Sequence, residues 1–137
     1  MCEKELIAIA LKARLKAYAP YSKFKVGAAL LAYDGKVFEG CNIENASYTP
    51  TSCAERTAFF QAVLKGERKF SKIVICGGKE DGEKLDYCAP CGVCRQVMME
   101  FCDPNTFEII LAKSIDEYQK YLLKDLLPLG FGPNNLI

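Results

Sequence analysis

The sequence predicts a layered α/β fold in which short strands alternate with helices. Segments rich in helix formers, with apolar residues at helical spacing, are separated by short apolar segments typical of strands. This alternation favours a sheet covered by helices. The chain has 137 residues, enough for one compact domain with its own core but not for two. We therefore expect one domain spanning residues 1–137.

The first part of the chain predicts a helix followed by a hairpin. Residues 3–17 are rich in helix formers and carry apolar side chains at helical spacing. Residues 18–22, which include a proline, end that helix. Strands are expected at residues 27–33 and 36–42, because the Asp34-Gly35 pair between them is a common hairpin turn.

The middle of the chain predicts a loop, a helix and a buried strand. Residues 45–52 are polar and form the loop, and Ser52-Cys53-Ala54-Glu55 is expected to open a second helix that runs to about Lys65. Residues 72–76 are apolar, as in a buried strand, and the two glycines that follow are expected to end it. The charged residues 79–84 indicate a solvated loop.

The last part predicts a third helix and a further strand. The helix is expected to begin at Pro90-Cys91 and to end near Phe101, and residues 107–112 form the strand. Residues 115–127 fit a helix and a strand equally well on their own pattern.

The composition makes several classes of function improbable. The chain has 18 basic and 17 acidic residues and no long basic stretch, so we expect a small uncharged substrate and no nucleic acid partner. No segment has the length of a membrane span, so no membrane partner is expected. The N-terminus lacks a basic region followed by an apolar run, which indicates a cytoplasmic protein without a signal peptide.

The chain contains eight cysteines and no histidine. Without histidine, neither Ser-His-Asp catalysis nor Cys-His catalysis is available within the chain, and no metal can be held by imidazole. In a reducing cytosol, cysteines are thiols or metal ligands. The cysteines are therefore the first place to look for chemistry.

Three of these cysteines predict a zinc site. Cys91 and Cys94 are three positions apart, so they share one face in the first turn of a helix, and Cys53 also begins a helix. Thiolates suit zinc, and a catalytic zinc has three protein ligands and an open position for water. Glu55 lies two positions after Cys53 and would carry protons to and from that water. The pattern therefore indicates hydrolysis.

Cys88 offers an alternative metal ligand, because it lies three positions before Cys91, the same spacing as between Cys91 and Cys94. A site built from Cys53, Cys88, Cys91 and Cys94 would be structural and would belong to a noncatalytic zinc-stabilised binding module. Cys88 lies before Pro90 and so outside the helix, which favours Cys91 and Cys94 as the ligand pair.

Three simpler interpretations stand beside the zinc site. The paired cysteines could form a redox dithiol. Ser52 and Glu55 match a capping box, in which the glutamate only satisfies the backbone at the helix start; the cysteine motifs outweigh this interpretation. The remaining cysteines are expected to be small buried hydrophobic residues, namely Cys2, Cys41, Cys76 and Cys102.

Taken together, the motifs resemble the small homotetrameric cytidine deaminases over nearly the whole chain. The resemblance implies a three-layer α-β-α fold with a five-stranded mixed sheet, in which residues 115–122 supply the last strand. It implies one zinc per chain and active sites completed by neighbouring subunits. It also implies hydrolysis of cytidine and deoxycytidine to uridine and deoxyuridine plus ammonia, as in pyrimidine salvage. The segments that carry it are 21–29, 40–48, 53–56, 90–96 and 126–128.

The resemblance assigns roles to further residues. Glu55 would move protons from water to N3 of the pyrimidine and then to the leaving ammonia. Asn42 and Glu44 are two apart, so they point the same way on a strand end and can hold sugar hydroxyls. Arg56 and Gln96 are expected to support the zinc ligands. The full set of expected substrate contacts is Phe24, Asn42, Glu44, Ala54, Ala46, Tyr48 and Phe131. A relative that deaminates another cytosine nucleoside, such as an antibiotic, is the nearest alternative.

Overall fold

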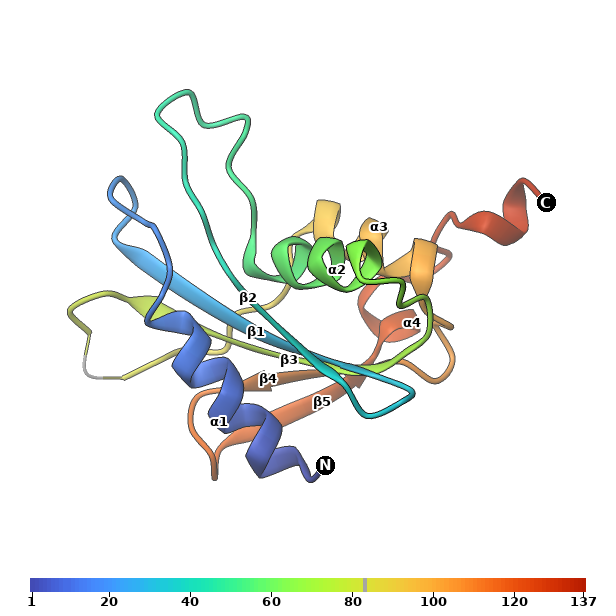
Figure 1. Ribbon diagram of the computed structural model, residues 1–137, viewed down its shortest axis with the longest axis horizontal. Coiled ribbons are helices and arrows are strands. Elements are labelled where there is room, and N and C mark those ends of the chain that lie inside the picture. The colour runs from blue at the N-terminus through green and yellow to red at the C-terminus, as the bar shows by residue number, and fades with distance from the viewer. Residues whose placement is uncertain (83) are drawn as a thin grey trace.

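Five strands form one mixed sheet with helices on both faces in the computed structural model, which describes residues 1–82 and 84–137 (Figure 1). The predicted three-layer α/β fold with a five-stranded sheet is therefore confirmed. Among the described residues, none of the helices has the length and apolar character that crossing a membrane requires. In chain order the elements are α1 Glu3–Arg14, β1 Phe24–Ala32, β2 Val37–Cys41, α2 Ala54–Leu64, β3 Phe70–Lys79, α3 Gly92–Phe101, β4 Glu108–Ala112, β5 Tyr118–Leu122, α4 Leu123–Leu126 and the 3₁₀ turn Pro133–Asn135.

The strand order in the sheet is β2-β1-β3-β4-β5. β1 is antiparallel to both β2 and β3, and β4 is antiparallel to β5. β3 and β4 are parallel, and α3 lies in the connection between them, as a parallel pair requires a crossover. The sheet is consequently mixed, with β2 and β5 at its edges.

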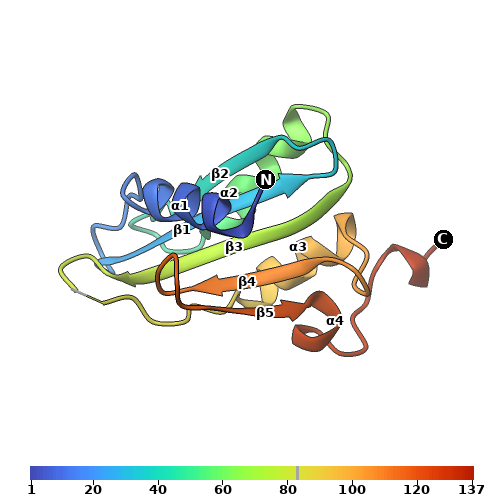
Figure 2. The same ribbon diagram turned by 90° about the horizontal axis from the view of Figure 1, so that it is seen from below.

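The central strands of the sheet, β1, β3 and β4, are buried on both faces. Figure 2 shows α1 in front of the strands and α2 and α3 behind them. Because successive residues of a strand point to opposite faces, Ala29 of β1 packs in the core under α1, whereas Ala28 and Leu30 pack under α2. In the core between the sheet and α2, the ring of Phe59 packs against the ring of Phe70, and the two ring centroids lie 5.2 Å apart. Helix α2 is therefore fixed on the sheet by a fully buried aromatic side chain.

Several predicted boundaries differ from the structure. Helix α1 ends at Arg14, three residues before the predicted end. β3 runs through Gly77 and Gly78 to Lys79, so the expectation that the glycines end the strand was wrong. A side chain at Gly77 would meet Cys88 and Val26 at 3.1 Å, which indicates that these glycines allow close packing in place of a turn.

The ambiguous residues 115–127 form both kinds of element. They contain the strand β5 and then the short helix α4, so the strand implied by the resemblance is confirmed. The predicted strand 107–112 corresponds to β4, which begins one residue later. In the predicted loop 79–84, Lys79 belongs to β3 and Glu83 lies outside the described residues.

Candidate metal centre and active site

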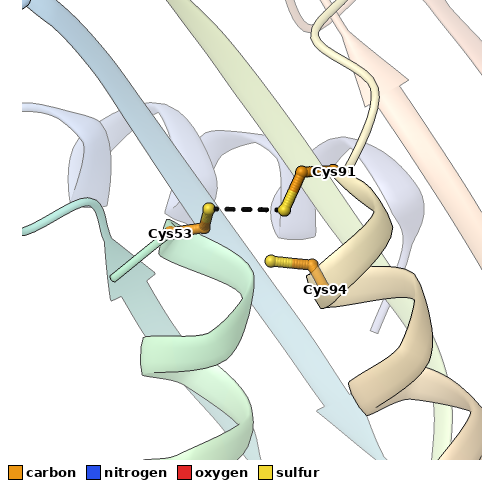
Figure 3. Close-up of side chains that lie close together, drawn as sticks. All are labelled: Cys53, Cys91 and Cys94. Atoms are coloured by element: carbon orange, nitrogen blue, oxygen red, sulfur yellow. Dashed lines mark hydrogen bonds between the residues drawn. The ribbon is translucent and has the colours of Figure 1, made fainter. Parts of the chain in front are cut away.

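Three cysteine sulfurs meet where α2 and α3 begin. Cys53 is the N-cap residue of α2, Cys91 is the N-cap residue of α3, and Cys94 lies in the first turn of α3. Their Sγ atoms all lie within 4.8 Å of one another, and the Cys53 and Cys91 sulfurs are 3.6 Å apart. Figure 3 shows the three side chains pointing toward a common centre. The predicted ligand residues thus come together from segments far apart in the sequence.

The start of α2 is seated on β2 through Gly40. A Cβ atom on Gly40 would lie 2.1 Å from the carbonyl oxygen of Ala54 and 2.7 Å from the backbone nitrogen of Ala58. Only glycine therefore permits this approach between the strand and the helix. The Thr57 hydroxyl adds a hydrogen bond to the Cys41 carbonyl oxygen at 3.0 Å. These contacts fix the end of α2 that carries Cys53.

Arg95 fixes the start of α3. Its Nε donates to the Pro90 carbonyl oxygen at 2.8 Å, immediately before Cys91, and its Nη1 donates to the Leu126 carbonyl oxygen at 3.0 Å. Hydrogen bonds from a charged donor are stronger than neutral ones. Arg95 therefore ties the residue before Cys91 to the end of α4.

The Cys53 sulfur lies in an environment that stabilises negative charge. A hydrogen bond with Cys94 is the largest cause that lowers the pKa of the Cys53 thiol, to about 5, and a hydrogen bond from Arg56 acts in the same direction. The same hydrogen bond raises the pKa of the Cys94 thiol, so Cys53 loses its proton more readily than Cys94 does. Arg56 Nη2 lies 3.4 Å from the Cys53 sulfur, and this bond raises the pKa of the guanidinium. A thiolate at Cys53 is therefore favoured.

Glu55 is buried beside the cluster. It is the second residue of α2 and is only 4 % exposed. Burial is the main cause that raises the pKa of its carboxyl from 4.5 to about 7, and the negative charge of Cys53 acts in the same direction. Cys53 is the N-cap residue and makes no side-chain cap hydrogen bond, so the alternative interpretation of Ser52 and Glu55 as a capping box does not describe the start of this helix. The carboxyl is thus poised between its two protonation states near neutral pH.

The donor set fits a zinc ion. With Zn–S bonds of about 2.3 Å, two sulfurs of a tetrahedral site lie about 3.8 Å apart, close to the 3.6 Å between Cys53 and Cys91. Arg56 Nε is buried without a hydrogen-bond partner among the described residues. Its guanidinium brings a positive charge beside three thiolates, which would otherwise leave a zinc site with a net negative charge. Soft sulfur ligands of this kind favour zinc over magnesium or calcium.

Cys88 is not part of the cluster. Among the described residues, the group that could hold a metal consists of Cys53, Cys91 and Cys94 alone. The half-buried side chain of Cys88 instead packs against Gly77 of β3, and burial raises the pKa of its thiol to about 11. The geometry therefore supports the three-sulfur site over the four-sulfur alternative.

The other four cysteines fit the expectation of buried hydrophobic residues only in part. Cys76 and Cys102 are buried, as predicted. Cys41 is half-buried at the end of an edge strand. The expectation was wrong for Cys2, which is exposed because it precedes the first helix at the N-terminus.

Asn42 and Glu44 both hold nearby backbone. The Val26 N–H donates to Asn42 Oδ1 at 2.9 Å, and Asn42 Nδ2 donates to the Phe24 carbonyl oxygen at 2.8 Å. Glu44 accepts hydrogen bonds from the backbone N–H groups of Tyr21 and Ser22 and from the Ser22 hydroxyl. These bonds keep the pKa of Glu44 below its usual value, with the Ser22 hydroxyl as the largest cause. A fixed amide and a fixed carboxylate therefore lie at the end of β2.

The other expected substrate contacts occupy different environments. Phe24 is the half-buried first residue of β1, and Ala54 is the fully buried first residue of α2. Ala46 and Tyr48 lie in the exposed loop after β2, and Phe131 is exposed near the C-terminus. Tyr48 and Glu44 line a cavity of about 380 Å³. A larger cavity of about 680 Å³, between α1, β2 and α2, contains none of the predicted site residues.

Several residues that organise the site were absent from the sequence-based set. Gly40 and Arg95 position the two helix starts, and Ser22 contacts Glu44. A glycine inside a predicted strand is a recognised sign of close approach, so Gly40 could have been found. Gln96 donates to the Phe131 carbonyl oxygen at 2.8 Å. Its side chain thus holds the C-terminal segment, and the role expected for it beside the cysteines remains a prediction.

Comparison with known proteins identifies the family. Residues 1–109 match the family model described as the cytidine and deoxycytidylate deaminase zinc-binding region. The chain belongs to this family. It is 45% identical over 133 residues to a cytidine deaminase from Sporosarcina psychrophila, an alignment that covers 97% of this chain and 93% of the relative. A cytidine deaminase from Halalkalibacterium halodurans is 44% identical over 99% of this chain and 98% of the relative.

Solved structures of this family share the fold. The cytidine deaminase from Burkholderia pseudomallei superposes with a TM-score of 0.86 at 49% identity, and the match covers 96% of this chain and all of that one. The enzyme from Mycobacterium tuberculosis gives a TM-score of 0.80 at 35% identity, covering 96% of this chain and 98% of that one. The similarity thus extends over the sheet, the helices and the segments that carry the cysteines.

Proposed function

We propose that this protein is a zinc-dependent cytidine deaminase that hydrolyses cytidine and deoxycytidine to uridine and deoxyuridine plus ammonia. The observation that carries the proposal is the convergence of three cysteine sulfurs beside one buried carboxyl, Glu55. The curated relatives, which align over nearly the whole chain, are named cytidine deaminases. We assign the activity to one catalytic domain that spans residues 1–137.

One zinc ion per chain would be held by Cys53, Cys91 and Cys94. When bound, zinc supplies the Lewis acidity that makes a water molecule reactive near neutral pH. Three thiolates weaken that acidity, because their charge exceeds that of the ion. The Arg56 hydrogen bond to Cys53 draws charge away from the sulfur and so offsets part of this effect.

Glu55 would carry the protons of the reaction. Its pKa of about 7 means that, at neutral pH, the carboxylate can accept a proton and the acid can return one. In the first half of the reaction Glu55 takes a proton from the attacking water and delivers it to N3, while the water oxygen bonds to C4. In the second half Glu55 takes the remaining proton from the new C4 hydroxyl and delivers it to the amino group, so that the C4–N bond breaks, ammonia leaves and a C4 carbonyl forms.

The other expected residues would bind the nucleoside. Asn42 and Glu44 would hold the sugar, Phe24 would stack on the base, and the backbone of Ala54 would contact the pyrimidine. We assign Ala46, Tyr48 and Phe131, all exposed in the single chain, to contacts with a neighbouring subunit's site in a homotetramer. A neutral cytosine nucleoside suits the near-zero net charge better than a nucleotide or a nucleic acid does. Pyrimidine salvage in the cytoplasm is the corresponding cellular role.

An ultraviolet assay with four substrates tests the activity. The purified protein is given cytidine, deoxycytidine, cytosine or cytidylate, and its zinc content per chain is measured in the same preparation. We expect rapid conversion of the two nucleosides and one zinc per chain. Turnover of cytidylate as fast as that of cytidine would overturn the substrate assignment.

Replacing Glu55 separates an enzyme from a noncatalytic zinc module. Glu55→Ala is expected to retain zinc, because the three cysteines remain, and to lose turnover by several orders of magnitude. Cys94→Ala serves as the matched comparison, since it removes a ligand and should lose the zinc itself. A Glu55→Ala variant as active as the wild type would rule out the proposed role of the carboxyl.

A further inference from the structure

The hydroxyl of Ser22 joins two of the residues expected to bind substrate. Its Oγ donates to Glu44 Oε2 and accepts a hydrogen bond from the Phe24 backbone N–H at 3.0 Å. A hydroxyl has only one proton to donate. Because the Phe24 carbonyl oxygen lies at 3.5 Å and the carboxylate is closer, that proton goes to Glu44. One side chain therefore contacts both the carboxylate and the first residue of β1.

The contacts of Ser22 determine which part of Glu44 remains free. A carboxylate offers about four acceptor positions, two on each oxygen. Oε1 accepts the backbone N–H groups of Tyr21 and Ser22 at 3.0 and 3.1 Å, and Oε2 accepts the Ser22 hydroxyl. Among the residues that the structure describes, these three donors leave one acceptor position, on Oε2. Glu44 is thus oriented to accept a single further donor.

The segment that carries Ser22 is itself held in place. The next residue, Lys23, has a φ of 57°, which an L-residue adopts only at a cost. Its N–H donates to the Ala19 carbonyl oxygen at 3.1 Å, and its carbonyl oxygen accepts from the Glu80 N–H at 2.7 Å. These bonds support the strained turn, so Ser22 contacts Glu44 from a fixed backbone.

Glu44 and Ser22 face a cavity large enough to receive part of a nucleoside. The cavity has a volume of about 380 Å³, and Tyr21 and Tyr48 also line it. The two tyrosine rings meet edge to face, with centroids 6.3 Å apart. Within the single chain, Glu44 and Ser22 therefore line a cavity beside two tyrosine side chains.

We propose that Ser22 is a positioning residue that orients the Glu44 carboxylate toward one hydroxyl group of the substrate sugar. The proposal rests on the proposed function, in which Glu44 binds the sugar. Without the Ser22 hydroxyl, Oε2 has two free acceptor positions. The carboxylate is then held only through Oε1, by the hydrogen bonds from the Tyr21 and Ser22 backbone N–H groups, and Oε2 can change its orientation. Ser22 itself need not touch the substrate.

Steady-state kinetics with two substrates test this role. Ser22→Ala is expected to raise KM for cytidine about tenfold, as expected for one weakened hydrogen bond to a charged group, with kcat within about twofold. Ser22→Thr keeps the hydroxyl and is expected to stay within about twofold of the wild type. With 2′,3′-dideoxycytidine, whose sugar lacks both secondary hydroxyls, Ser22→Ala and the wild type should have the same KM.

A double-substitution cycle distinguishes positioning from a general structural effect. If Ser22 acts through Glu44, introducing Ser22→Ala into a Glu44→Gln variant should raise the KM of that variant by less than about twofold. The proposal would be overturned if Ser22→Ala raised the KM for dideoxycytidine as much as the KM for cytidine. A full tenfold increase in KM when Ser22→Ala is introduced into the Glu44→Gln variant would also overturn it.

A measurement that needs no turnover separates this proposal from the proposed function. In a ¹³C NMR titration of the intact protein, Ser22→Ala should raise the pKa of the Glu44 carboxyl toward 4.5, and Ser22→Thr should leave it low. An unchanged Glu44 pKa in Ser22→Ala refutes the positioning role even in an active enzyme. A wild-type protein that does not convert cytidine refutes the proposed function, while the titration still decides whether Ser22 orients Glu44.

Discussion

Substituting Gly40 should damage the metal centre although this residue is not one of the three cysteines expected to bind the metal. A Cβ atom at this position would lie 2.1 Å from the Ala54 carbonyl oxygen, whereas real Cβ contacts are essentially never shorter than 3.0 Å. In Gly40→Ala the start of α2 must therefore retreat by about 0.9 Å, the difference between these distances. The obstructing atoms belong to the backbone, so no side-chain rotation can relieve the contact.

This retreat is large compared with the tolerance of a zinc site. Ligand distances in such sites hold to within about 0.2 Å, and a shift of the start of α2 away from β2 would displace both Cys53 and Glu55. We expect zinc affinity to fall at least about tenfold and the free energy of unfolding to fall by about 1–3 kcal/mol, the usual cost of overpacking. Competition with a chromophoric zinc chelator measures the first quantity, and urea unfolding followed by circular dichroism measures the second.

Gly92 provides the matched control. It lies between Cys91 and Cys94 at the start of α3, yet a Cβ atom there would meet nothing within 4 Å. Gly92→Ala should therefore keep zinc affinity and should be as stable as the wild type or slightly more stable, since alanine favours a helix. If Gly40→Ala bound zinc as tightly as Gly92→Ala, the close seating of α2 on β2 would not be what places Cys53.

Three further substitutions test individual groups of the site. Cys88→Ala should keep full zinc content by metal analysis, because its side chain packs against Gly77 and not in the cluster; loss of the metal would restore the four-sulfur site. Arg56→Gln should weaken zinc binding about tenfold in chelator competition, since the hydrogen bond to Cys53 is lost; unchanged affinity would deny that bond any part in holding the metal. The raised pKa of Glu55, about 7 against 4.5, means that the folded zinc-free protein binds this proton more tightly than the unfolded chain does. The free energy of unfolding should therefore fall by about 3 kcal/mol as pH rises from 4.5 past 7. In urea unfolding at pH 5 and pH 8, Glu55→Gln should lack this decrease. An equal decrease in the free energy of unfolding between pH 5 and pH 8 in the two proteins would mean that the carboxyl does not titrate as described.

The sequence was sufficient to predict the fold class and the cysteines that meet. Helical spacing in residues 3–17 and the Asp34-Gly35 turn are local signals, and the structure follows them closely. The pairing of Cys53 with Cys91 is not local, because 38 positions separate them. It became predictable because both residues stand at a helix start and because the motifs resemble those of a known family.

Other features depended on tertiary contacts that no local pattern shows. Gly77 and Gly78 read as a strand end, yet β3 continues through them because neighbouring side chains need the space. Residues 115–127 could not be assigned from their own pattern, because pairing of β5 with β4 decides where the strand ends and α4 begins. Ser22 acts through a carboxylate 22 positions away, and its sequence neighbours give no sign of that contact.

The number of sulfur atoms around the bound zinc decides between an enzyme and a structural module. X-ray absorption at the zinc edge of the purified protein counts them without relying on activity. We expect three sulfur neighbours at about 2.3 Å and one oxygen neighbour at about 2.0 Å. Four sulfur neighbours would close the position that water needs and would contradict the catalytic interpretation.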